Sequence, residues 1–555
     1  MTVRVWWALS TGGRSEKVSF ANRAVHGVSQ GLYAKSSRDR AESGGGAAVM
    51  AIFGKSPEPA ARVQGVATPI CSCLLPPSSI MSLISSAWPD VAESLEAMPK
   101  DYADRITSMV HFLQPQQSRI EQFASSFHPL SLPCRLVTEK YTWGQSFAVF
   151  EIRFVDGLSW IIRFGMRPMD AYFNTAAQLE RKILNEAAAI HLVRQRTTIP
   201  VPQIIAYHAH PSPTNPLGPD FPAFVLMTAI TGMTIEDCGI NIHELGLASV
   251  PDVNGHVPDA LGGDESKRPI LQRYLRDIAD IHAQLSRITF DRIGSFVIDV
   301  NGEVSIGPGA DFGLGPFESA KEYFELQAEA YEHLAVAEGL DDEEDVGSED
   351  AAQLKRRFVA SLWRKAMMSL VDERDDRGPF PMRHGDLHSE NILVDETGHI
   401  VGVLDWDCAG TVPWEAFAVP TFEVSGHITD LDGGSCGEDS SAQDSASPPE
   451  ATNRQDRTVV HDAFNRELAA VEAQRAPVMV KPPSGRSLAA LHDSDAGYVG
   501  AYLAYWMYSL SCDYDQTGRP LYRLLKSGDD IDSAFQTFVQ ETMAEAKGDS
   551  VAATF

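Results

Sequence analysis

Apolar residues recur at two different spacings in the first half of the chain. From Ala87 to Phe127 they return every three or four residues, which predicts amphipathic helix. Alternation then predicts strands over Ser146–Phe154 and Leu158–Phe164, joined by the hairpin turn Asp156-Gly157. A helical period returns over Ala176–Gln195. This half therefore predicts helices leading into a small antiparallel sheet.

Helical patterns dominate the second half. After a short apolar strand over Phe224–Ile230, the segment Ile270–Ile288 carries an apolar stripe at helical spacing. Helices are also predicted over 318–338 and 352–371, and the aromatic, periodic segment Tyr498–Leu510 predicts another. The expected fold class is therefore α+β, with a sheet first and a mostly helical part after it.

Two segments show no sustained period. Residues 1–90 are rich in Ser, Ala and Gly, and residues 426–488 form an acidic, Ser- and Pro-rich stretch with at most a short helix near Ala463–Val471. Such segments bury too little apolar surface to offset their ordering entropy, so both are predicted to be disordered. For the basic N-terminal part, a disordered extension or a start upstream of the true one is favoured over a mitochondrial transit peptide. A cytoplasmic location is expected, with a mitochondrial one as the alternative.

Charge and cysteine content narrow the function classes. The formal net charge of −29 argues against nucleic-acid binding, which needs a basic face. No stretch approaches the roughly 20 apolar residues of a membrane span, so no membrane partner is expected. The seven cysteines are scattered without paired C-x-x-C spacing, which argues against a disulfide scaffold or a zinc site. The oligomeric state cannot be read from the sequence.

The strongest chemical signal is the run His384-Gly385-Asp386-Leu387-His388-Ser389-Glu390-Asn391, followed by two apolar runs around the polar turn 396–399 and then by Leu404-Asp405-Trp406-Asp407. If residues 396–399 form a hairpin loop, Asp395 faces Ile400 and Asn391 faces Leu404. Carboxylate and amide oxygens then gather at the open end of the hairpin. Mg²⁺ prefers such ligands, and phosphoryl transfer also needs a carboxylate that accepts the proton of the attacking hydroxyl.

H-G-D-x-x-x-x-N followed by L-D-W-D resembles the signature of the aminoglycoside/choline phosphotransferase family, which is related to protein kinases. The resemblance implies that Asp386 is the catalytic base, that His384 orients its loop, and that Asn391 and Asp405 hold Mg²⁺. Asp407 is assigned to the metal or to structure. The segment Asp311-Phe312-Gly313 spells the protein-kinase metal motif but precedes His384, the wrong chain order, and is rejected.

The same resemblance places the nucleotide in the small lobe. The segment Tyr141–Phe147, with Gly144, Ser146 and Phe147, is similar to the family's phosphate-covering loop. The strand residue expected to pair with the phosphates is Arg163 where kinases usually carry Lys, and its expected partner is Glu186. The W-x-x-R pattern that ends in Arg163 resembles fungal members of the family, as do residues 290–295 and 315–324. The segment after Phe224 resembles the hinge, with adenine expected at the backbone near Thr228 and Ile230.

The resemblance implies a two-lobed protein-kinase-like fold. The expected divisions are an extension (1–90), a helical lead-in (91–130), an N-lobe (131–231), a C-lobe (232–425), an insertion (426–488) and further C-lobe helices (489–545). The expected activity is ATP- and Mg²⁺-dependent phosphorylation of a hydroxyl on a small molecule such as an amino alcohol or amino sugar. Glu415 and Glu423 are candidates for receiving a cationic acceptor. The alternative is a nucleotide-binding pseudokinase scaffold, suggested by Arg163 and the long aperiodic segments.

Overall fold

A computed structural model of the chain describes most of the residues outside the two aperiodic segments. The described residues are 84–88, 90–166, 175–242, 265–299, 301–310, 313–337, 346–424, 459–475, 480–497, 499, 518–525 and 530–552. They form two compact units. Unit 1 contains the N-terminal part to Leu192 with Pro202–Thr231 and Phe296–Ser305, and unit 2 contains the remainder.

Unit 1 is built on a five-stranded antiparallel sheet with the strand order β1-β2-β3-β5-β4. Its strands are β1 (Cys134–Trp143), β2 (Phe147–Phe154), β3 (Ser159–Gly165), β4 (Ile204–His208) and β5 (Phe224–Thr228). The predicted hairpin turn is present, and Gly157 adopts a φ of 93° there. Strand β4 was not predicted, because its five residues follow two prolines and are too few to establish a period.

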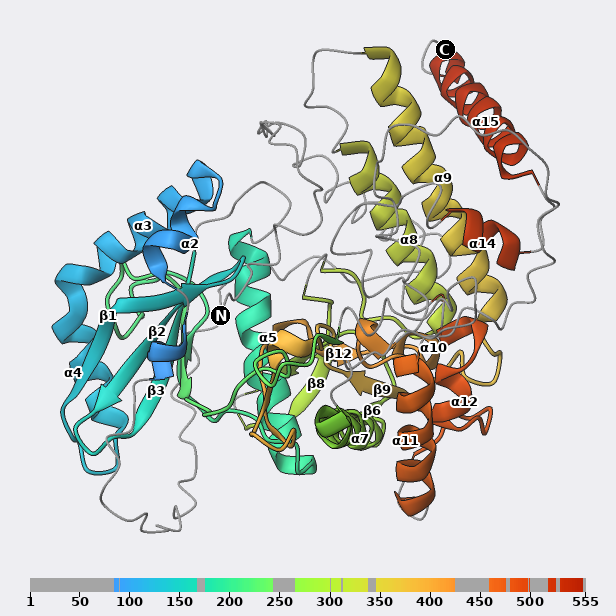
Figure 1. The fold of residues 1–555 in the computed structure, drawn as a ribbon. Coiled ribbons are helices and arrows are strands. Elements are labelled where there is room, and N and C mark those ends of the chain that lie inside the picture. Colours follow the sequence, from blue (N-terminus) through green and yellow to red (C-terminus); the bar gives the residue numbers. More distant parts are fainter. Residues whose placement is uncertain are drawn as a thin grey trace, which may run out of the picture. The chain divides into compact units, whose positions relative to one another are not determined.

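Helices cover both faces of this sheet (Figure 1). On one face, Phe150, Ile152 and Phe164 pack against α3 (Lys100–Leu113) and α4 (Gln117–Phe127). On the other, Phe147, Val225 and Met227 pack against α5 (Ala176–Arg196). Because successive strand residues point to opposite faces, Arg163 lies on the α5 side, between Ile162 and Phe164 of the α3 side. The sheet therefore positions Arg163 next to the helix that carries Glu186.

The N-terminal boundary of the fold differs from the prediction. Residues 84–88 were assigned to a disordered extension, but η2 (Ile84–Ala87) is ordered and precedes α2 (Val91–Glu96). The backbone N–H of Ser85 donates to Oε2 of Glu151 at 2.8 Å, and Glu151 is fully buried. A buried carboxylate needs hydrogen-bond donors, and this segment supplies one of them. Residues 1–83 lie outside the described part of the chain.

A second difference concerns the hairpin of β7 (Ser295–Ile298) and β8 (Val304–Gly307). The sequence prediction placed residues 232–425 wholly in the C-lobe, whereas Phe296–Ser305 belongs to unit 1. The backbone N–H of Phe296 donates to Oδ1 of the buried Asn185 on α5 at 2.7 Å. A side chain far away in sequence thus fixes the segment, which is why periodicity did not reveal it.

Unit 2 is mostly helical. Its elements are η4 (Glu265–Lys267), α7 (Arg268–Leu285), β6 (Thr289–Phe290), α8 (Ala320–Ala337), α9 (Val346–Leu370), β9 (Phe380–Arg383), η6 (Ser389–Asn391), β10 (Ile392–Val394), β11 (Ile400–Val403), η7 (Trp406–Cys408), β12 (Gly410–Thr411), α10 (Trp414–Phe417), η8 (Phe422–Val424), α11 (Val459–Arg475), α12 (Leu488–His492), α14 (Arg519–Leu524) and α15 (Ile531–Ala552). The predicted helices over 270–288, 318–338 and 352–371 are therefore present, the last with an earlier start. None of the described helices is long and apolar enough to cross a membrane.

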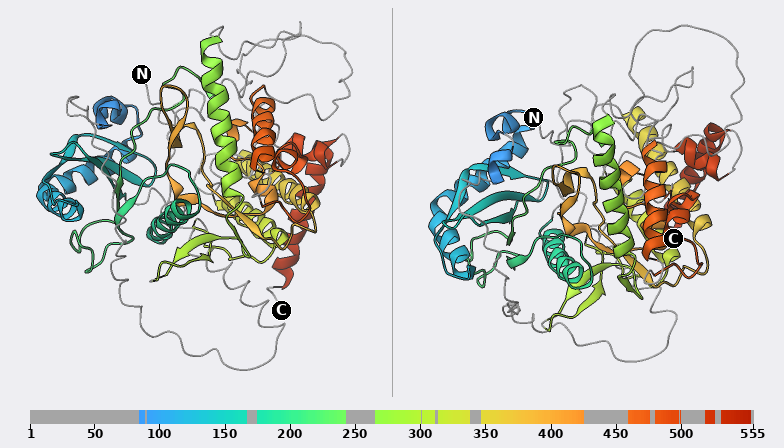
Figure 2. Two further views of the ribbon diagram at one scale, coloured as in Figure 1. Left: turned by 90° about the horizontal axis from the view of Figure 1, so that it is seen from below. Right: turned by 60° about the horizontal axis from the view of Figure 1, so that its bottom comes forward.

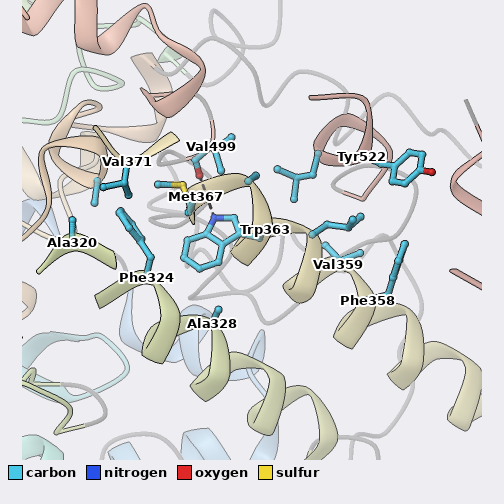
Figure 3. Close-up of a cluster of buried hydrophobic side chains, with 14 of the residues drawn as sticks. Ala320, Phe324, Ala328, Phe358, Val359, Trp363, Met367, Val371, Val499 and Tyr522 are labelled. Atoms are coloured by element: carbon cyan, nitrogen blue, oxygen red, sulfur yellow. Dashed lines mark hydrogen bonds between the residues drawn. The ribbon is translucent and has the colours of Figure 1, made fainter. Parts of the chain in front are cut away.

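One hydrophobic core of unit 2 lies between α8, α9 and residues near the C-terminus. Figure 3 shows Trp363 on α9 at its centre, beside Phe324 of α8 and Val499. The indole N–H of Trp363 donates to the backbone oxygen of Val499 at 3.4 Å. Val499 is the described residue of the predicted helix Tyr498–Leu510, most of which lies outside the described residues.

The prediction of disorder over 426–488 is wrong for its C-terminal part. Helix α11 runs alongside α7 (Figure 2) and buries one face made of Val460, Phe464, Leu468 and Val471. Polar contacts tie the same pair of helices, including that between Arg475 and Asp280. The short helix expected near Ala463–Val471 is present, and it is longer than expected. Residues 425–458 lie outside the described part.

Candidate active site

The predicted hairpin is formed by β10 and β11, and its open end has the predicted pairing. Ile392 pairs with Val403 and Leu393 pairs with Gly402. The backbone N–H of Leu404 donates to the oxygen of Asn391 at 2.9 Å. Asn391 and Asp405, two of the predicted metal ligands, are therefore held at the same end of the hairpin, as the spacing predicted.

The register near the turn differs from the prediction. Val394 pairs with Ile400, so Val401 bulges out of the ladder and Asp395 does not face Ile400 as a strand residue. The cause is the Asp395 side chain, whose Oδ1 accepts the N–H of Thr397 at 2.8 Å and that of His399 at 3.1 Å. This side chain satisfies the turn locally, and these bonds hold the pKa of Asp395 below its usual value, led by the hydrogen bond from the Thr397 hydroxyl.

His384 links the loop of Asp386 to the end of β11. Its Nε2 donates to the backbone oxygen of Leu404 at 2.9 Å, and its Nδ1 accepts the N–H of Asp386 at 3.3 Å. The ring is 2% exposed and lies against Trp406 at 4.3 Å between ring centroids. Burial lowers the pKa of His384 to about 4. A neutral ring can donate from one nitrogen and accept at the other, and these two bonds join the loop of Asp386 to the end of β11.

Two residues of the site have a left-handed backbone. Gly385 has a φ of 92°, and a Cβ placed on it would lie 2.1 Å from the backbone oxygen of Cys408. Asp405 has a φ of 62°, which is uncommon for a residue with a side chain. Such conformations cost energy and persist where the surrounding structure enforces them, most often at functional sites. Both loops of the sequence motif therefore contain a residue with an energetically costly backbone.

Asp386 and Asn391 are joined through one amide group. Nδ2 of Asn391 donates to the backbone oxygen of Asp386 at 2.9 Å and lies 3.0 Å from Nε2 of His388. Because an amide nitrogen donates, this His388 nitrogen accepts, and the Asn391 amide is oriented from two sides. Nε2 of His388 also lies 3.8 Å from Oδ2 of Asp386, whose side chain is 31% exposed. Sequence analysis did not assign His388 a role, although its place in the motif was visible.

The donor set fits Mg²⁺ carried by a nucleotide. The amide nitrogen of Asn391 is engaged, which leaves its side-chain oxygen as the atom that could hold a metal ion, and Asp405 follows directly after Leu404. Asp407, the third predicted ligand, lies on η7 and is 5% exposed. Within the described residues, no group of three or more His, Cys, Asp or Glu side chains is arranged to hold a metal ion. Mg²⁺ needs no such cage, because it usually takes one or two carboxylates together with phosphate oxygens and water.

Unit 1 contains the predicted phosphate-covering loop in shortened form. Tyr141–Trp143 belong to β1 and Phe147 begins β2, so the loop itself is residues 144–146. The N–H of Gly144 donates to the oxygen of Phe147 at 3.0 Å, and the Tyr102 hydroxyl donates to the oxygen of Gly144 at 2.6 Å. The backbone of Ser146 is tied as well, since its oxygen accepts the N–H of Met166 at 2.9 Å. This is a tightly held hairpin turn.

The predicted ion pair between Arg163 and Glu186 is present. Nη1 of Arg163 lies 2.7 Å from Oε1 of Glu186, and the two side chains are 11% and 1% exposed. The Arg163 guanidinium also lies 4.2 Å from the ring centroid of Phe147, a cation–π contact. Phe147 is 4% exposed, so its ring supports Arg163, whereas the prediction assigned it to the nucleotide.

The two predicted hinge residues, Thr228 and Ile230, differ in whether their backbone N–H already donates a hydrogen bond within the described chain. The N–H of Thr228 donates to the oxygen of Gln203 at 2.9 Å, and that of Ala229 donates to Ser159. The Thr228 hydroxyl oxygen accepts the N–H of Gln203. Among the described residues, no hydrogen bond uses the N–H of Ile230. Of the two predicted positions, Ile230 therefore offers a backbone donor to a ligand and Thr228 does not.

Glu415 is a structural residue, which corrects its candidacy for the acceptor. It is fully buried, and its Oε1 lies 3.2 Å from Nη2 of Arg486 and accepts the N–H of Asp372. Arg486 also pairs with the buried Asp375 at 3.1 Å. Burial raises the pKa of Glu415. Glu423 has different surroundings: its Oε1 accepts the backbone N–H of Ser389, on the loop of Asp386, at 2.8 Å.

One unit is a small antiparallel sheet with a buried Arg–Glu pair. The other is mostly helical, and Asp, Asn and Asp lie at or beside the open end of its hairpin. These features are those of kinase-like phosphotransferases. The sequence model of the phosphotransferase enzyme family matches residues 137–415, just over half of the chain. The chain belongs to this family, and it is therefore a phosphotransferase of the small-molecule kinase type with the protein-kinase-like fold. The match includes both the Arg163–Glu186 pair and the hairpin.

Solved structures of similar proteins include a macrolide 2′-phosphotransferase from Brachybacterium faecium, with 14% identity over 74% of this chain and 98% of that one and a TM-score of 0.34. Others are an ethanolamine kinase from Plasmodium vivax (12% identity, 71% and 83% covered, TM-score 0.35) and a spectinomycin phosphotransferase in complex with ADP and its antibiotic (10%, 72% and 92%, 0.33). These TM-scores are low, and the family assignment rests on the sequence model. No curated protein matches the chain significantly.

Proposed function

We propose that the protein transfers the γ-phosphoryl group of ATP, in the presence of Mg²⁺, to a hydroxyl group of a small molecule such as an amino alcohol or amino sugar. The observation that carries the proposal is the open end of the β10–β11 hairpin. There, the loop of Asp386 is bonded through Asn391 to the strand that leads into Asp405. This arrangement offers a proton acceptor and oxygen ligands on adjacent segments.

Asp386 is assigned as the base. As the acceptor oxygen forms a bond to the γ-phosphorus and the bond to the β-phosphate oxygen breaks, the hydroxyl proton moves to the Asp386 carboxylate. Its partial exposure gives an acceptor access to it. His384, neutral and buried, keeps the Asp386 backbone in place. Positioning of this kind supplies much of the rate enhancement in phosphoryl transfer.

Asn391 and Asp405 are assigned to Mg²⁺, which when bound neutralises charge on the phosphates. His388 and the backbone of Asp386 orient the Asn391 amide so that its oxygen is the ligand atom. Arg163 of unit 1 is assigned to the nucleotide phosphates. Its bond to Glu186 and its contact with Phe147 restrict its rotamers, so less entropy is lost when a phosphate binds.

The experiment is ADP release by the purified protein against a panel of amino alcohols, amino sugars and neutral sugars, with Mg²⁺ present or chelated. Mass spectrometry of the acceptor identifies the product. The proposal expects release that depends on one class of acceptor and stops on chelation. Binding of Mg²⁺-ATP without turnover on any acceptor would favour the scaffold alternative, and absence of nucleotide binding would contradict both.

A further inference from the structure

Glu423 is a buried carboxylate with one oxygen satisfied and one not. It is 5% exposed, and its Oε1 accepts the N–H of Ser389 at 2.8 Å. Its Oε2 is buried and has no hydrogen-bond partner among the described residues. Nor does Glu423 form an ion pair with another described side chain. A buried charge with an unsatisfied oxygen is costly, so the position calls for a partner that the described chain does not provide.

Two hydroxyl groups, one on the same segment as Glu423 and one on the loop bonded to it, are also buried without a hydrogen-bond partner in the described chain. Oγ of Ser389 and Oγ1 of Thr421 are buried and lack hydrogen-bond partners among the described residues. Ser389 and Thr421 are 1% and 4% exposed. Ser389 is bonded to Glu423 through its backbone, and Thr421 lies two residues before Glu423 on the same segment. Three unsatisfied polar atoms thus occur on two segments that one hydrogen bond joins.

Glu415, eight residues earlier, shows what a structural carboxylate looks like in this unit. It is fully buried, and its Oε2, like that of Glu423, has no hydrogen-bond partner among the described residues, but Arg486 supplies a cation and Asp372 an N–H to its Oε1. Arg486 thus provides a cation for Glu415, whereas no described Lys, Arg or His side chain pairs with Glu423. The two glutamates therefore differ in whether a described side chain supplies a cation.

We propose that Glu423 binds an ammonium group of the acceptor, with Ser389 and Thr421 accepting its remaining N–H groups. An ammonium carries three donors and no acceptor, which matches one carboxylate oxygen and two hydroxyl oxygens. A neutral hydroxyl would leave the charge of Glu423 uncompensated. The inference rests on the proposed function and deepens it, because Ser389 lies three residues after Asp386 on the same loop. The acceptor is then an amine whose reactive hydroxyl reaches Asp386 while its nitrogen binds at Glu423.

The test compares wild type with Glu423→Gln on acceptor pairs that differ in one group: glucosamine with glucose, and 2-aminoethanol with 1,2-ethanediol. Loss of one charged hydrogen bond corresponds to a rise of roughly 10- to 100-fold in KM for the amines. The KM for ATP is expected to stay unchanged, and the KM for the neutral member of each pair should change by a much smaller factor than that for the amine. Thr421→Val should raise the KM for the amine by a smaller factor.

Stability separates a binding role from a structural one. In Glu423→Gln the new side-chain amide oxygen would still accept the Ser389 N–H, so this variant is expected to melt at or above the wild-type temperature. Glu415→Gln, which breaks a buried ion pair, is expected to melt well below it. The surface variant Glu396→Gln is the neutral control for both readouts.

The outcomes distinguish the inference from the proposed function. If wild type turns over acceptors but Glu423→Gln treats amines and neutral partners as wild type does, or melts as low as Glu415→Gln, the ammonium site is wrong and the proposed function stands. Equal preference of wild type for both members of each pair also overturns the site. If wild type turns over no acceptor, the proposed function fails and the inference fails with it.

Discussion

The two units hold their candidate residues by different means. In unit 1, Arg163 and Glu186 lie in the middle of a strand and a helix, and a direct ion pair joins their side chains. In unit 2, Asp386 and Asp405 lie on loops. Gly385 and Asp405 have a positive φ there, and the buried His384 forms hydrogen bonds with the backbone of Asp386 and of Leu404. Regular elements fix the first pair, and a network of backbone contacts fixes the second.

This difference predicts different responses to substitution. A side chain on a regular element can change without moving the backbone, so losses in unit 1 should depend on charge and length. A loop with positive φ and close backbone contacts has no such freedom. In unit 2, small changes should therefore act through the position of the carboxylates and have larger effects on turnover.

The largest effect is expected for Asp405→Asn. Asn tolerates the left-handed backbone, so the loop should keep its shape while the ligand loses its charge. Turnover is expected to fall roughly 10²- to 10³-fold, by analogy with loss of one group that stabilises transition-state charge, and the Mg²⁺ concentration for half-maximal activity should rise. The measurement is a Mg²⁺ titration of ADP release. An unchanged Mg²⁺ requirement would contradict the assignment.

Two glycine substitutions test the comparison itself. Gly385→Ala places a Cβ 2.1 Å from the Cys408 oxygen at a positive φ, so it should destabilise the fold by about 1–3 kcal/mol and abolish most turnover. In Gly144→Ala, by contrast, the new Cβ has nothing within 4 Å. Denaturant unfolding of both variants checks the difference. Equal losses would mean that the loops of the two units are equally constrained.

The ion pair of unit 1 is tested by a double-mutant cycle of Arg163→Met and Glu186→Gln. Each single change leaves one buried charge without its partner, and such losses are typically about 3–5 kcal/mol. The double variant should lose less than the sum. Arg163→Lys keeps the charge and is expected to raise the KM for ATP by less than Arg163→Met does. Additive losses in the cycle would show that the pair is not coupled.

The smallest effect concerns pH. The pKa of His384 is lowered to about 4 in the folded state, from 6.5. As the pH falls, His384 is therefore protonated in the unfolded chain before it is protonated in the folded protein. The contribution of neutral His384 to the free energy of unfolding is fully present above pH 6.5 and is lost as the pH drops toward 4. His384→Gln should show a shallower fall in unfolding free energy between pH 7 and pH 5. His282, whose pKa burial lowers to about 3, acts in the same direction and remains in both proteins. Identical slopes would contradict a neutral, buried His384.

The sequence predicted the parts of the structure that depend on local pattern. The pairing of Asn391 with Leu404 followed from hairpin spacing, and the Arg163–Glu186 pair followed from the family resemblance. The bulge at Val401 was missed because it depends on how one side chain, Asp395, satisfies the turn.

Long-range contacts account for the other differences. The β7–β8 segment joins unit 1 through Asn185, and α11 buries its apolar face on α7 although its surroundings are acidic. The contrast between Glu415 and Glu423 depends on Arg486, which lies 71 residues from Glu415. No local period carries information on such partners, so both glutamates received the same candidate role from the sequence.

The central claim is that Asp386 accepts the proton during transfer of the γ-phosphoryl group. The most direct measurement is a single-turnover reaction with γ-labelled ATP, run side by side for wild type and Asp386→Asn, with nucleotide affinity measured on both. The account predicts that label reaches the acceptor in wild type, and that the variant binds Mg²⁺-ATP equally well but transfers label roughly 10²- to 10⁴-fold more slowly. Transfer at the wild-type rate by Asp386→Asn would contradict it.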